Sequence, residues 1–431
     1  MTNFLNKPVV GIDISADFSW IAILSPSGEA YRKAFKINHD LSGFNYLLEE
    51  IKKVEERYNM KTGIFMESTG EYHISLFYFL NTTFDNVFII NPLITNSNKN
   101  SDIRKVKNDK TDSLAIAKLG KYQNPKVSKA LSLDILTLKS LEREYYKFKD
   151  DSSNLKKRLS SSLRIVFPGY SKVFSNPTGK TSLLLLSKYP TPRDVLNANK
   201  DTLLALISTS SRKGLSWSNK LYEKLMLCAN EAVIIGLSLP YFSIKITGPI
   251  NQIIGINLEI KALIETINTM ILESPRFTKI INLLKSIPGV GAITAITLLA
   301  EIDAITKFKT PKQLVAFFGL DCSVNQSGKF NSTNNKISKR GTRIGRRALF
   351  AVALASIRKN RNGTYINKVL YNYYSETLKG KKPKVSLIAI MHKLLNYIFA
   401  VLRDEKPFES RDPDIHKRMF LENKSQNQNA A

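Results

Sequence analysis

Cysteine is scarce in this sequence. Cys228 and Cys322 are the only two in 431 residues, which is too few for a disulfide framework and is typical of a reducing cytoplasm. Histidine is scarce as well, and the four histidines show none of the paired spacing that zinc sites use, so we expect no zinc site.

Long apolar runs are also absent. No run reaches the roughly 18 residues that a membrane-spanning helix needs. Residues 1–8 lack the basic start and apolar core of a secretory signal. We therefore expect a cytoplasmic protein.

Acidic residues are too few to balance the basic ones. Lys and Arg number 64 against 36 Asp and Glu, a net charge of +28. Residues 1–112 carry 13 basic and 14 acidic side chains, and residues 113–321 carry 29 and 15. Residues 322–403 carry 17 basic residues and one acid, Glu376, whereas residues 404–431 carry 5 and 6. A neutral module beside a strongly basic one indicates a polyanionic partner, nucleic acid before an anionic membrane surface.

The first 125 residues alternate between strand and helix patterns. Short β-branched runs predict an antiparallel three-strand meander, with strands at residues 8–13, 20–24 and 30–37. Further elements are predicted as helix 41–58, strand 64–66, helix 72–80, strand 87–90 and helix 110–120. This order predicts a mixed α/β domain over residues 1–125.

Residues 126–275 read as helical. Two stretches place apolar residues at alternating spacings of three and four, the seam of a coiled coil or long helical hairpin. They consist of Leu138, Leu141, Tyr145, Phe148, Leu155 and Leu159, interrupted at Ser152, and of Ile253, Ile256, Ile260, Leu263, Ile267 and Met270. An amphipathic helix on a globular core is the alternative for the first stretch. Residues 168–250 predict a helical insertion between the two.

A C-terminal domain is predicted over residues 276–403, followed by a polar tail at 404–431. Residues 281–302 read as helix, turn and helix, with Pro-Gly-Val-Gly in the turn. This pattern indicates a helix-hairpin-helix, in which Gly289 and Gly291 let the backbone approach a phosphate. An ordinary helical turn is the alternative.

Four carboxylates occupy positions suited to metal binding. Asp13 and Glu67 each end a buried strand, where a carboxylate is costly unless it is paired or bound to a metal. Asp109 and Asp112 lie three apart at the start of a predicted helix and share one face. Carboxylate oxygens are the ligands that Mg²⁺ prefers, and two such ions stabilise phosphoryl transfer. Each residue taken singly has a simpler explanation as a helix cap or a turn former.

Three blocks of sequence now carry a family resemblance: Val-Val-Gly-Ile-Asp at 9–13, Met-Glu-Ser-Thr-Gly at 66–70 and Lys-Asn-Asp-Lys-Thr-Asp at 107–112. They resemble the catalytic blocks of the RuvC-like domain in DEDD insertion-sequence transposases, the bridge-RNA-guided serine recombinases. The resemblance implies an RNase H-like fold, with Mg²⁺ (or Mn²⁺) bound by Asp13, Glu67, Asp109 and Asp112. Glu71 is a nearby competitor for the glutamate role.

The resemblance extends to the C-terminal half, through blocks at residues 287–291, 314–320, 326–328 and 337–341, the last together with Arg346 and Arg347. It implies that Ser327 is a nucleophile, with Ser323, Ser332 and Ser338 as nearby rivals. Basic residues follow that are suited to phosphate backbones: Lys329, Lys336, Lys339, Arg340, Arg343, Arg346 and Arg347. Aromatic residues suited to base stacking are interleaved further along: Tyr365, Tyr371, Tyr373 and Tyr374.

As a member of that family, the chain would cleave and exchange donor and target DNA through a covalent phosphoserine link. A structured noncoding guide RNA would direct it, in the prokaryotic cytoplasm at the nucleoid. The resemblance also implies homodimers that pair into a tetramer, with each active site completed by a different subunit.

Three other functions remain open. A RuvC-like junction-resolving nuclease would use the carboxylates for hydrolysis without Ser327. A sugar or acetate kinase also has Gly-Ile-Asp ahead of a strand pair, but no glycine-rich adenosine segment follows here. A non-catalytic nucleic-acid-binding scaffold would need only the basic surface.

Overall fold

The computed structural model describes residues 4–68, 71–92, 94–95, 109–123, 127–128, 132–211, 213–237, 239–322, 326–327, 330–331, 336–411, 415 and 418. The chain divides into two compact units, residues 1–132 and 133–431. The first unit holds 17 basic and 14 acidic residues and the second holds 47 and 22, so the basic excess belongs almost entirely to the second.

The first unit is built on a mixed six-stranded sheet of order β3-β2-β1-β4-β5-β6. Its strands are β1 (Val9–Ile14), β2 (Phe18–Leu24), β3 (Phe35–Asn38), β4 (Gly63–Glu67), β5 (Val87–Ile90) and β6 (Val127–Ser128). β1, β2 and β3 form the predicted antiparallel meander, while β4 and β5 join parallel to β1. The predicted mixed α/β character is confirmed.

Two details of the sheet differ from the prediction. The third strand was expected over residues 30–37, but Ala30 makes only an isolated bridge to Leu24. The chain leaves the ladder after that bridge, where the Arg32 guanidinium turns to the Tyr46 hydroxyl and the Glu50 carboxylate of the first helix. The short antiparallel strand β6 was not predicted, because two residues carry no periodicity.

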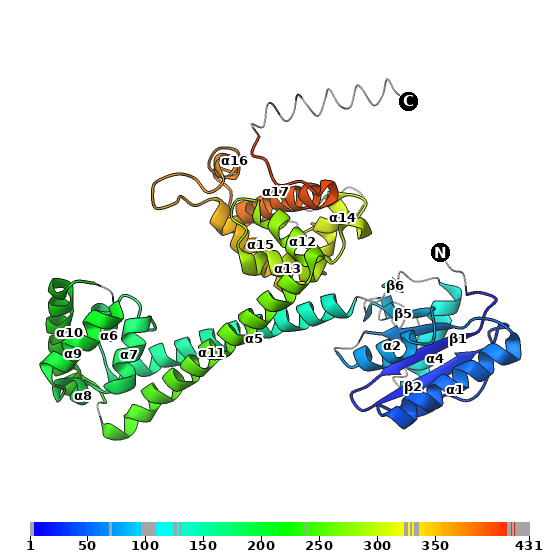
Figure 1. Cartoon of the computed structure of the whole chain (residues 1–431), viewed down its shortest axis with the longest axis horizontal. Helices are drawn as coiled ribbons and strands as arrows, with labels where there is room; N and C mark the ends of the chain where they lie inside the picture. The colour runs from blue at the N-terminus through cyan, green and yellow to red at the C-terminus, as the bar shows by residue number, and fades with distance from the viewer. Residues whose placement is uncertain are drawn as a thin grey trace. The chain divides into compact units, whose positions relative to one another are not determined.

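Helices cover both faces of the sheet (Figure 1). α1 (Leu41–Tyr58) and α2 (His73–Asn81) pack on one face, and α4 (Asp109–Tyr122) packs on the other. Alternate residues of β1 pack into the hydrophobic cores on the two faces of the sheet, because successive side chains of a strand point to opposite faces. Val10 and Ile12 pack against α1 and α2, while Val9 packs with the apolar face of α4.

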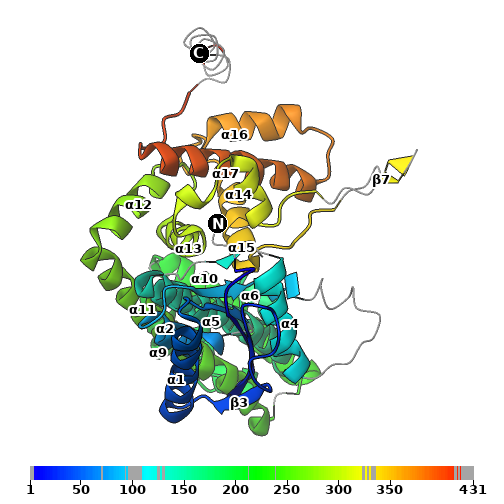
Figure 2. The ribbon, with the colours of Figure 1, turned by 90° about the vertical axis from the view of Figure 1, so that its right-hand side faces the viewer.

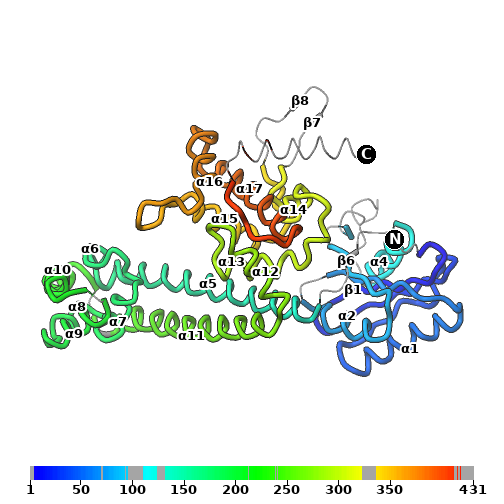
Figure 3. The backbone as a smooth tube through the Cα atoms, turned by 45° about the horizontal axis from the view of Figure 1, so that its top comes forward, coloured from blue at the N-terminus to red at the C-terminus, as the bar shows by residue number. Residues whose placement is uncertain are grey.

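Two long helices dominate the second unit. α5 (Leu133–Val166) and α11 (Ile244–Glu273) run antiparallel, side by side (Figure 3). α5 passes through Ser152 without a break, and this serine is buried. The predicted pair of long helices is therefore present, and Ser152, which interrupts the apolar repeat, occupies a buried position without breaking the helix.

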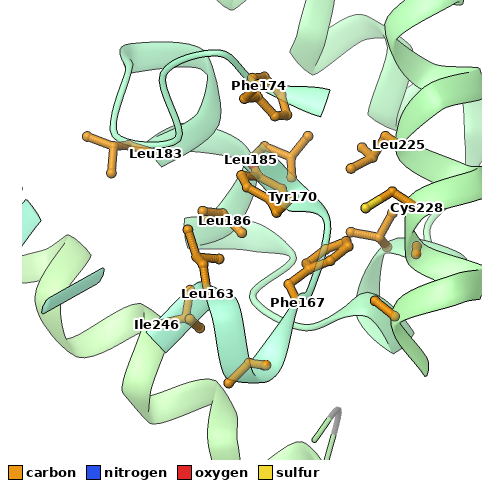
Figure 4. Close-up of a cluster of buried hydrophobic side chains, with 14 of the residues drawn as sticks. Leu163, Phe167, Tyr170, Phe174, Leu183, Leu185, Leu186, Leu225, Cys228 and Ile246 are labelled. Atoms are coloured by element: carbon orange, nitrogen blue, oxygen red, sulfur yellow. The ribbon is translucent and has the colours of Figure 1, made fainter. Parts of the chain in front are cut away.

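A helical insertion connects the two long helices at one end. It comprises α6 (Tyr170–Val173), α7 (Lys180–Lys188), α8 (Pro192–Leu196), α9 (Lys200–Ser211), α10 (Leu215–Ile235) and η1 (Pro240–Ser243). Its core gathers around Phe167 and Tyr170, which pack with side chains of α7 and α10 (Figure 4). The Tyr170 hydroxyl is satisfied inside this core by Ser182 Oγ at 2.9 Å.

The remaining helices of the second unit pack mostly around one long helix, α17 (Pro383–Asp404) (Figure 2). They are α12 (Pro275–Lys285), α13 (Ala292–Ile302), η2 (Ile305–Lys307), α14 (Pro311–Phe317), α15 (Arg343–Ser356), α16 (Lys368–Asn372) and η3 (Tyr373–Thr377). By length and composition alone, α17 could span a membrane. Its residues Leu387, Ile390, Leu394 and Ile398 are instead buried against the other helices, which is the pattern of a core helix.

Candidate active site

Asp13 and Glu67 lie at the same edge of the first unit's sheet. β1 pairs in parallel with β4 so that Gly11 meets Phe65 and Ile12 meets Met66. The next position along each strand is Asp13 and Glu67, and both side chains are half-buried. Because strand faces alternate, both carboxylates belong to the face that Phe65 shares with α4. The structure therefore places two of the four predicted ligands as neighbours on one face.

Helix α4 lies very close to that face at Gly11. A Cβ atom at Gly11 would lie 2.2 Å from the Ser113 carbonyl oxygen and 2.3 Å from the Ala117 nitrogen, so only glycine allows this contact. The first turn of α4 then reaches the Asp13 end of β1. The Lys110 ammonium lies 4.9 Å from the ring centroid of Trp20, and Trp20 is the antiparallel neighbour of Asp13.

The opposite end of α4 is held by a buried lysine. Lys121 is 3% exposed, and its ammonium donates to the carbonyls of Lys7 and Pro26 at 2.9 and 3.0 Å. Burial lowers the pKa of this group. α4 therefore runs opposite to β1, with both ends tied, and its N-terminal turn is fixed beside the carboxylate edge of the sheet.

The helix start brings the other two predicted ligands to this edge. Asp109 is the first residue of α4, although its side chain lies outside the description, and Asp112 is half-buried one turn later. Among the side chains that the structure describes, no three of His, Cys, Asp or Glu lie close enough to hold a metal ion. The donor chemistry is nonetheless that of magnesium, since these side chains offer only carboxylate oxygens, beside a helix N-terminus that favours negative charge.

Ser327 lies in a short hairpin of the second unit. Its strand β7 (Gln326–Ser327) pairs with β8 (Phe330–Asn331), so that Ser327 faces Phe330. The side chains of this hairpin lie outside the described structure, as do Lys329 and the rival serines Ser323 and Ser332. The third rival, Ser338, is described and has a structural partner, because its hydroxyl donates to the Asp321 carboxylate at 2.5 Å.

The two chain segments that lead to this hairpin are clamped together. Cys322 and Ile337 form a β-bridge, and the backbone of Lys339, at a φ of 54°, donates to the Gly319 carbonyl at 3.0 Å. Gly319 and Gly341 approach so closely that a Cβ on either would overlap the other segment's backbone. From α17, His392 Nε2 lies 3.0 Å from the Leu320 carbonyl oxygen. We call residues 319–322 and 336–341 the hairpin stem.

Arg346 supports the hairpin stem from α15. Its guanidinium donates to the carbonyls of Phe318 and Gly341 at 3.0 and 2.7 Å, and burial lowers its pKa. Arg347 also has internal partners, because it forms an ion pair with Asp150 of α5 at 2.8 Å and lies over the Tyr146 ring. Both arginines were predicted to bind nucleic acid. The structure gives Arg346 a packing role, whereas Arg347 remains 43% exposed beside its partners.

The other predicted basic residues are exposed around the hairpin stem. Lys336, Lys339 and Arg340 belong to the stem itself, and Arg343 begins α15. The Thr342 hydroxyl caps this helix by accepting from the Gly345 nitrogen at 3.2 Å. The result is a cationic surface at a helix N-terminus, and both features attract phosphate.

The two glycines of the turn between α12 and α13 have different surroundings. Gly289 has a φ of 99°, and a Cβ there would lie 2.6 Å from Ser356 Oγ on α15, so this glycine serves tight packing. The Ser356 hydroxyl donates to the Pro288 carbonyl and closes the same contact. Gly291 is exposed at the start of α13, where backbone N–H groups point outward.

Sequence reasoning missed a buried polar cluster between α5 and α13. Lys139 pairs with Glu301 at 3.0 Å, and the Tyr146 hydroxyl lies 3.2 Å from Thr297 Oγ1. Between these pairs on α5, Glu142 is 1% exposed, and neither of its carboxylate oxygens has a hydrogen-bond partner. Burial, and then the neighbouring Glu301 carboxylate, raise the pKa of Glu142 to about 8.

Family models match the two regions described above. One, described as a transposase, matches residues 10–168, and another, described as the transposase IS116/IS110/IS902 family, matches residues 281–367. The first spans the carboxylate edge, and the second spans the hairpin stem and α15. The chain belongs to the IS110 family of transposases.

Curated relatives support this membership. An uncharacterized protein of insertion element IS110 from Streptomyces coelicolor is 25% identical over 230 residues, 53% of this chain and 53% of the relative. Pilin gene-inverting proteins are 32% identical in Moraxella bovis, over 32% of this chain and 41% of the relative, and 33% identical in Moraxella lacunata, over 30% and 39%. The chain thus matches about half or less of each relative's length.

Proposed function

We propose that this IS110-family chain is a DNA recombinase of an insertion sequence. The observation that carries the proposal is the placement of Asp13 and Glu67 as neighbours on the sheet face that α4 covers, with Asp112 in the first turns of α4. This arrangement of an α/β domain is that expected of a RuvC-like catalytic fold. The relatives named as gene-inverting proteins act in DNA rearrangement by name, which favours the same class.

The carboxylates would hold the divalent metal. Asp13, Glu67, Asp109 and Asp112 are the proposed ligands of Mg²⁺, and Mn²⁺ fits the same oxygen donors. When bound, the metal supplies positive charge to a phosphate that is being transferred. The tie between α4 and Gly11 keeps the helix-borne ligands beside the strand-borne pair.

Ser327 is the proposed nucleophile. Its hydroxyl oxygen forms a bond to the scissile phosphorus and releases its proton, while the bond from phosphorus to the leaving DNA oxygen breaks and that oxygen takes up a proton. Strand exchange reverses the step on a second DNA end, so the phosphodiester energy is conserved without ATP. The hairpin stem would fix the position of the hairpin that carries the serine. The exposed Lys336, Lys339 and Arg340 would offer positive charge to the phosphates.

The partners that we propose are donor and target DNA and a structured noncoding guide RNA. The exposed start of α13 at Gly291 is the part of the α12–α13 turn that is suited to a phosphate, as in a helix-hairpin-helix. The α5–α11 pair is the proposed coiled-coil region. We further propose homodimers that pair into a tetramer in a prokaryotic cytoplasm, with carboxylates and serine supplied by different subunits.

Two measurements test the proposal. The first traps the covalent link: wild-type protein and end-labelled DNA of the element's own ends should give a denaturant-stable adduct. Ser327→Ala should abolish the adduct and Ser338→Ala should retain it. Retention of the adduct in Ser327→Ala would show that another residue is the nucleophile. The second sequences the RNA that copurifies with the chain. One abundant RNA from the flank of its own gene supports RNA guidance, and random fragments contradict it.

Subunit sharing has its own test. Asp13→Asn and Ser327→Ala are each expected to be inactive alone. A mixture of the two proteins should recover strand cleavage if one subunit supplies the carboxylates and another the serine. A mixture as inactive as its components would mean that both act within one subunit.

A junction-resolving nuclease is the second candidate, favoured by one observation: the carboxylate edge belongs to a unit that is compact without the second. Such an enzyme would hydrolyse DNA with water. Cleavage at the wild-type rate in Ser327→Ala, together with its loss in Asp13→Asn, would favour this candidate over the recombinase.

A further inference from the structure

A basic, tyrosine-rich segment follows α15, beyond most of the region that the family model matches. We call residues 358–384 the tyrosine lobe. It contains eight basic residues against one acid, Glu376. Within the part of the chain that the structure describes, none of the eight forms an ion pair. Eight uncompensated cations in 27 residues repel one another, so a polyanion is the partner that this segment fits.

Two tyrosines of the lobe have their rings in contact, in a tilted arrangement. The ring centroids of Tyr365 and Tyr371 lie 4.1 Å apart, with an angle of 33° between the ring planes. Both side chains are half-buried, so the pair reaches the surface. The Lys359 ammonium lies 4.8 Å from the Tyr365 centroid, and these two residues are paired by a β-bridge.

The backbone beneath the pair is firmly held. Asn367, between the two tyrosines, is 5% exposed, and its side chain accepts from the Leu370 nitrogen at the start of α16. Its carbonyl accepts from the Tyr371 nitrogen at 2.9 Å, and its own nitrogen donates to the Ser356 carbonyl of α15 at 3.2 Å. Both rings therefore project from backbone that is anchored to the domain core.

A small hairpin carries cations past the rings. The Asn360 nitrogen donates to the Thr364 carbonyl at 2.7 Å, and the Ile366 nitrogen donates to the Arg358 carbonyl at 3.0 Å. This closes a turn that exposes Arg358, Lys359 and Arg361. An aromatic surface flanked by flexible cations is the arrangement with which proteins bind unpaired nucleotides.

We propose that Tyr365 and Tyr371, with Lys359, form a stacking site for an unpaired base of a nucleic-acid strand. The base stacks on the tyrosine pair, and Arg358 and Arg361 hold the adjoining phosphates. The Lys359 ammonium leaves the Tyr365 ring for a phosphate, which its long flexible side chain permits. Because bases of an intact duplex are already stacked on their neighbours, the site favours single strands, loops or strand ends.

This inference deepens the proposed function, since it names the kind of nucleic acid that the lobe would hold. Unpaired strands arise both in a guide RNA and in DNA whose duplex has been opened. The shared chemistry is an exposed base next to a phosphodiester, and oligoribonucleotides and oligodeoxynucleotides of one sequence distinguish the two sources.

The test measures binding of fluorescently labelled 20-nucleotide strands to the full chain by anisotropy, with RNA, DNA and the corresponding DNA duplex. The variant Tyr365→Leu/Tyr371→Leu should weaken binding of at least one single strand by about tenfold to a hundredfold and leave duplex binding within twofold. Loss with RNA alone identifies an RNA site, and loss with DNA alone a DNA site. Equal loss on duplex and single strands, or no loss, would overturn the proposal.

Two controls keep this result interpretable. Tyr241→Leu removes a tyrosine that is 87% exposed in the insertion, and it should change nothing. Tyr365→Phe/Tyr371→Phe keeps both rings and should bind single strands as the wild type does. If the leucine variant does not fold, photocrosslinking of 5-bromouracil strands to the wild type decides instead: a crosslink at Tyr365 or Tyr371 supports the site, and its absence contradicts it.

The binding assay is independent of strand cleavage. If the wild type fails to cleave DNA but single-strand binding responds to the tyrosines, the recombinase proposal fails and the stacking site stands. If cleavage requires Asp13 and Ser327 but the tyrosine variant binds single strands as the wild type does, the recombinase proposal stands and the stacking site fails.

Discussion

Gly11 of β1 lies so close to Ser113 of α4 that a Cβ at Gly11 would come within 2.2 Å of the Ser113 carbonyl oxygen. The contact joins the strand that carries Asp13 to the helix that carries Asp112. Gly11 therefore sets the distance between helix and sheet, and through that distance it sets the position of the proposed metal ligands on α4.

Gly11→Ala is expected to push α4 away from the sheet. We expect a loss of about 1–3 kcal/mol in the free energy of unfolding, as for other overpacked cores. DNA cleavage should fall about a hundredfold, because small displacements of a catalytic group carry that cost. Urea unfolding and a cleavage assay measure the two effects.

The matched control is Gly255→Ala in α11, where an added Cβ meets nothing within 4 Å. It should raise stability by roughly 0.5–1 kcal/mol, as removing glycine from a helix interior does. Equal destabilisation by both variants would mean that the Gly11 contact is not special.

Glu142→Gln is expected to stabilise the protein in a pH-dependent way. The folded-state pKa of Glu142 is about 8, against an ordinary value of 4.5, so the folded chain keeps a proton that the unfolded chain releases. The wild type therefore loses stability as the pH rises from about 4.5 to 8. The glutamine cannot ionise, so its advantage should grow across this window, by up to about 5 kcal/mol at roughly 1.4 kcal/mol per pKa unit.

Thermal unfolding between pH 4.5 and 8.5 measures this difference. Glu144→Gln is the control on the same helix, because the Glu144 side chain is 43% exposed and pairs only with Lys147 at 3.7 Å. Its melting temperature should follow the wild type at every pH. A Glu142 variant whose advantage is constant with pH would show that this carboxyl does not titrate in the window.

Ser338→Ala is expected to loosen the hairpin stem. The lost hydrogen bond to Asp321 frees one segment that leads to Ser327. We expect DNA cleavage to slow about tenfold, equivalent to ~1.4 kcal/mol, with unchanged affinity for DNA. Ser338→Thr retains the hydroxyl and should restore the rate. If threonine is as slow as alanine, the hydrogen bond is not what matters.

Arg343 and Arg347 are expected to differ although they lie only four positions apart on α15. Arg343 is exposed at the start of α15, so Arg343→Ala should weaken DNA binding and reduce the slope of log affinity against log salt by about 1. Arg347 is also exposed, but Asp150 already compensates its charge and Tyr146 lies under it, so Arg347→Ala should change the salt slope less than Arg343→Ala does. Titrations at several salt concentrations compare them, and identical slopes would refute the distinction.

Much of the first unit could be predicted because its signals are local. The helix 41–58 was predicted with the bounds that the structure has, since its apolar positions repeat at helical spacing. The meander was recognisable from short β-branched runs separated by turns, such as the one that Gly28 closes at a φ of 95°. The third strand was overestimated because Arg32, which fits the alternation, finds its partners on α1.

The basic surface was predicted less well. Composition identified the cationic segment, but composition does not distinguish an exposed arginine from one that donates to carbonyls inside the domain. Arg346 and Arg340 are equivalent in the sequence pattern, and only packing makes the first a support of the hairpin stem.

Local pattern alone determined that Asp13 and Glu67 each end a buried strand, that residues 41–58 are helical, and that the positive charge lies beyond residue 112. These follow from periods of two and 3.6 residues and from counting charges. Tertiary structure decided that α4 meets β1 at Gly11, that Asp321 and Ser338 close the hairpin stem, and that the carboxylate oxygens of Glu142 are buried without a hydrogen bond. Each of these is a contact between segments distant in the chain, and its energy depends on burial and approach distance, which no local pattern encodes.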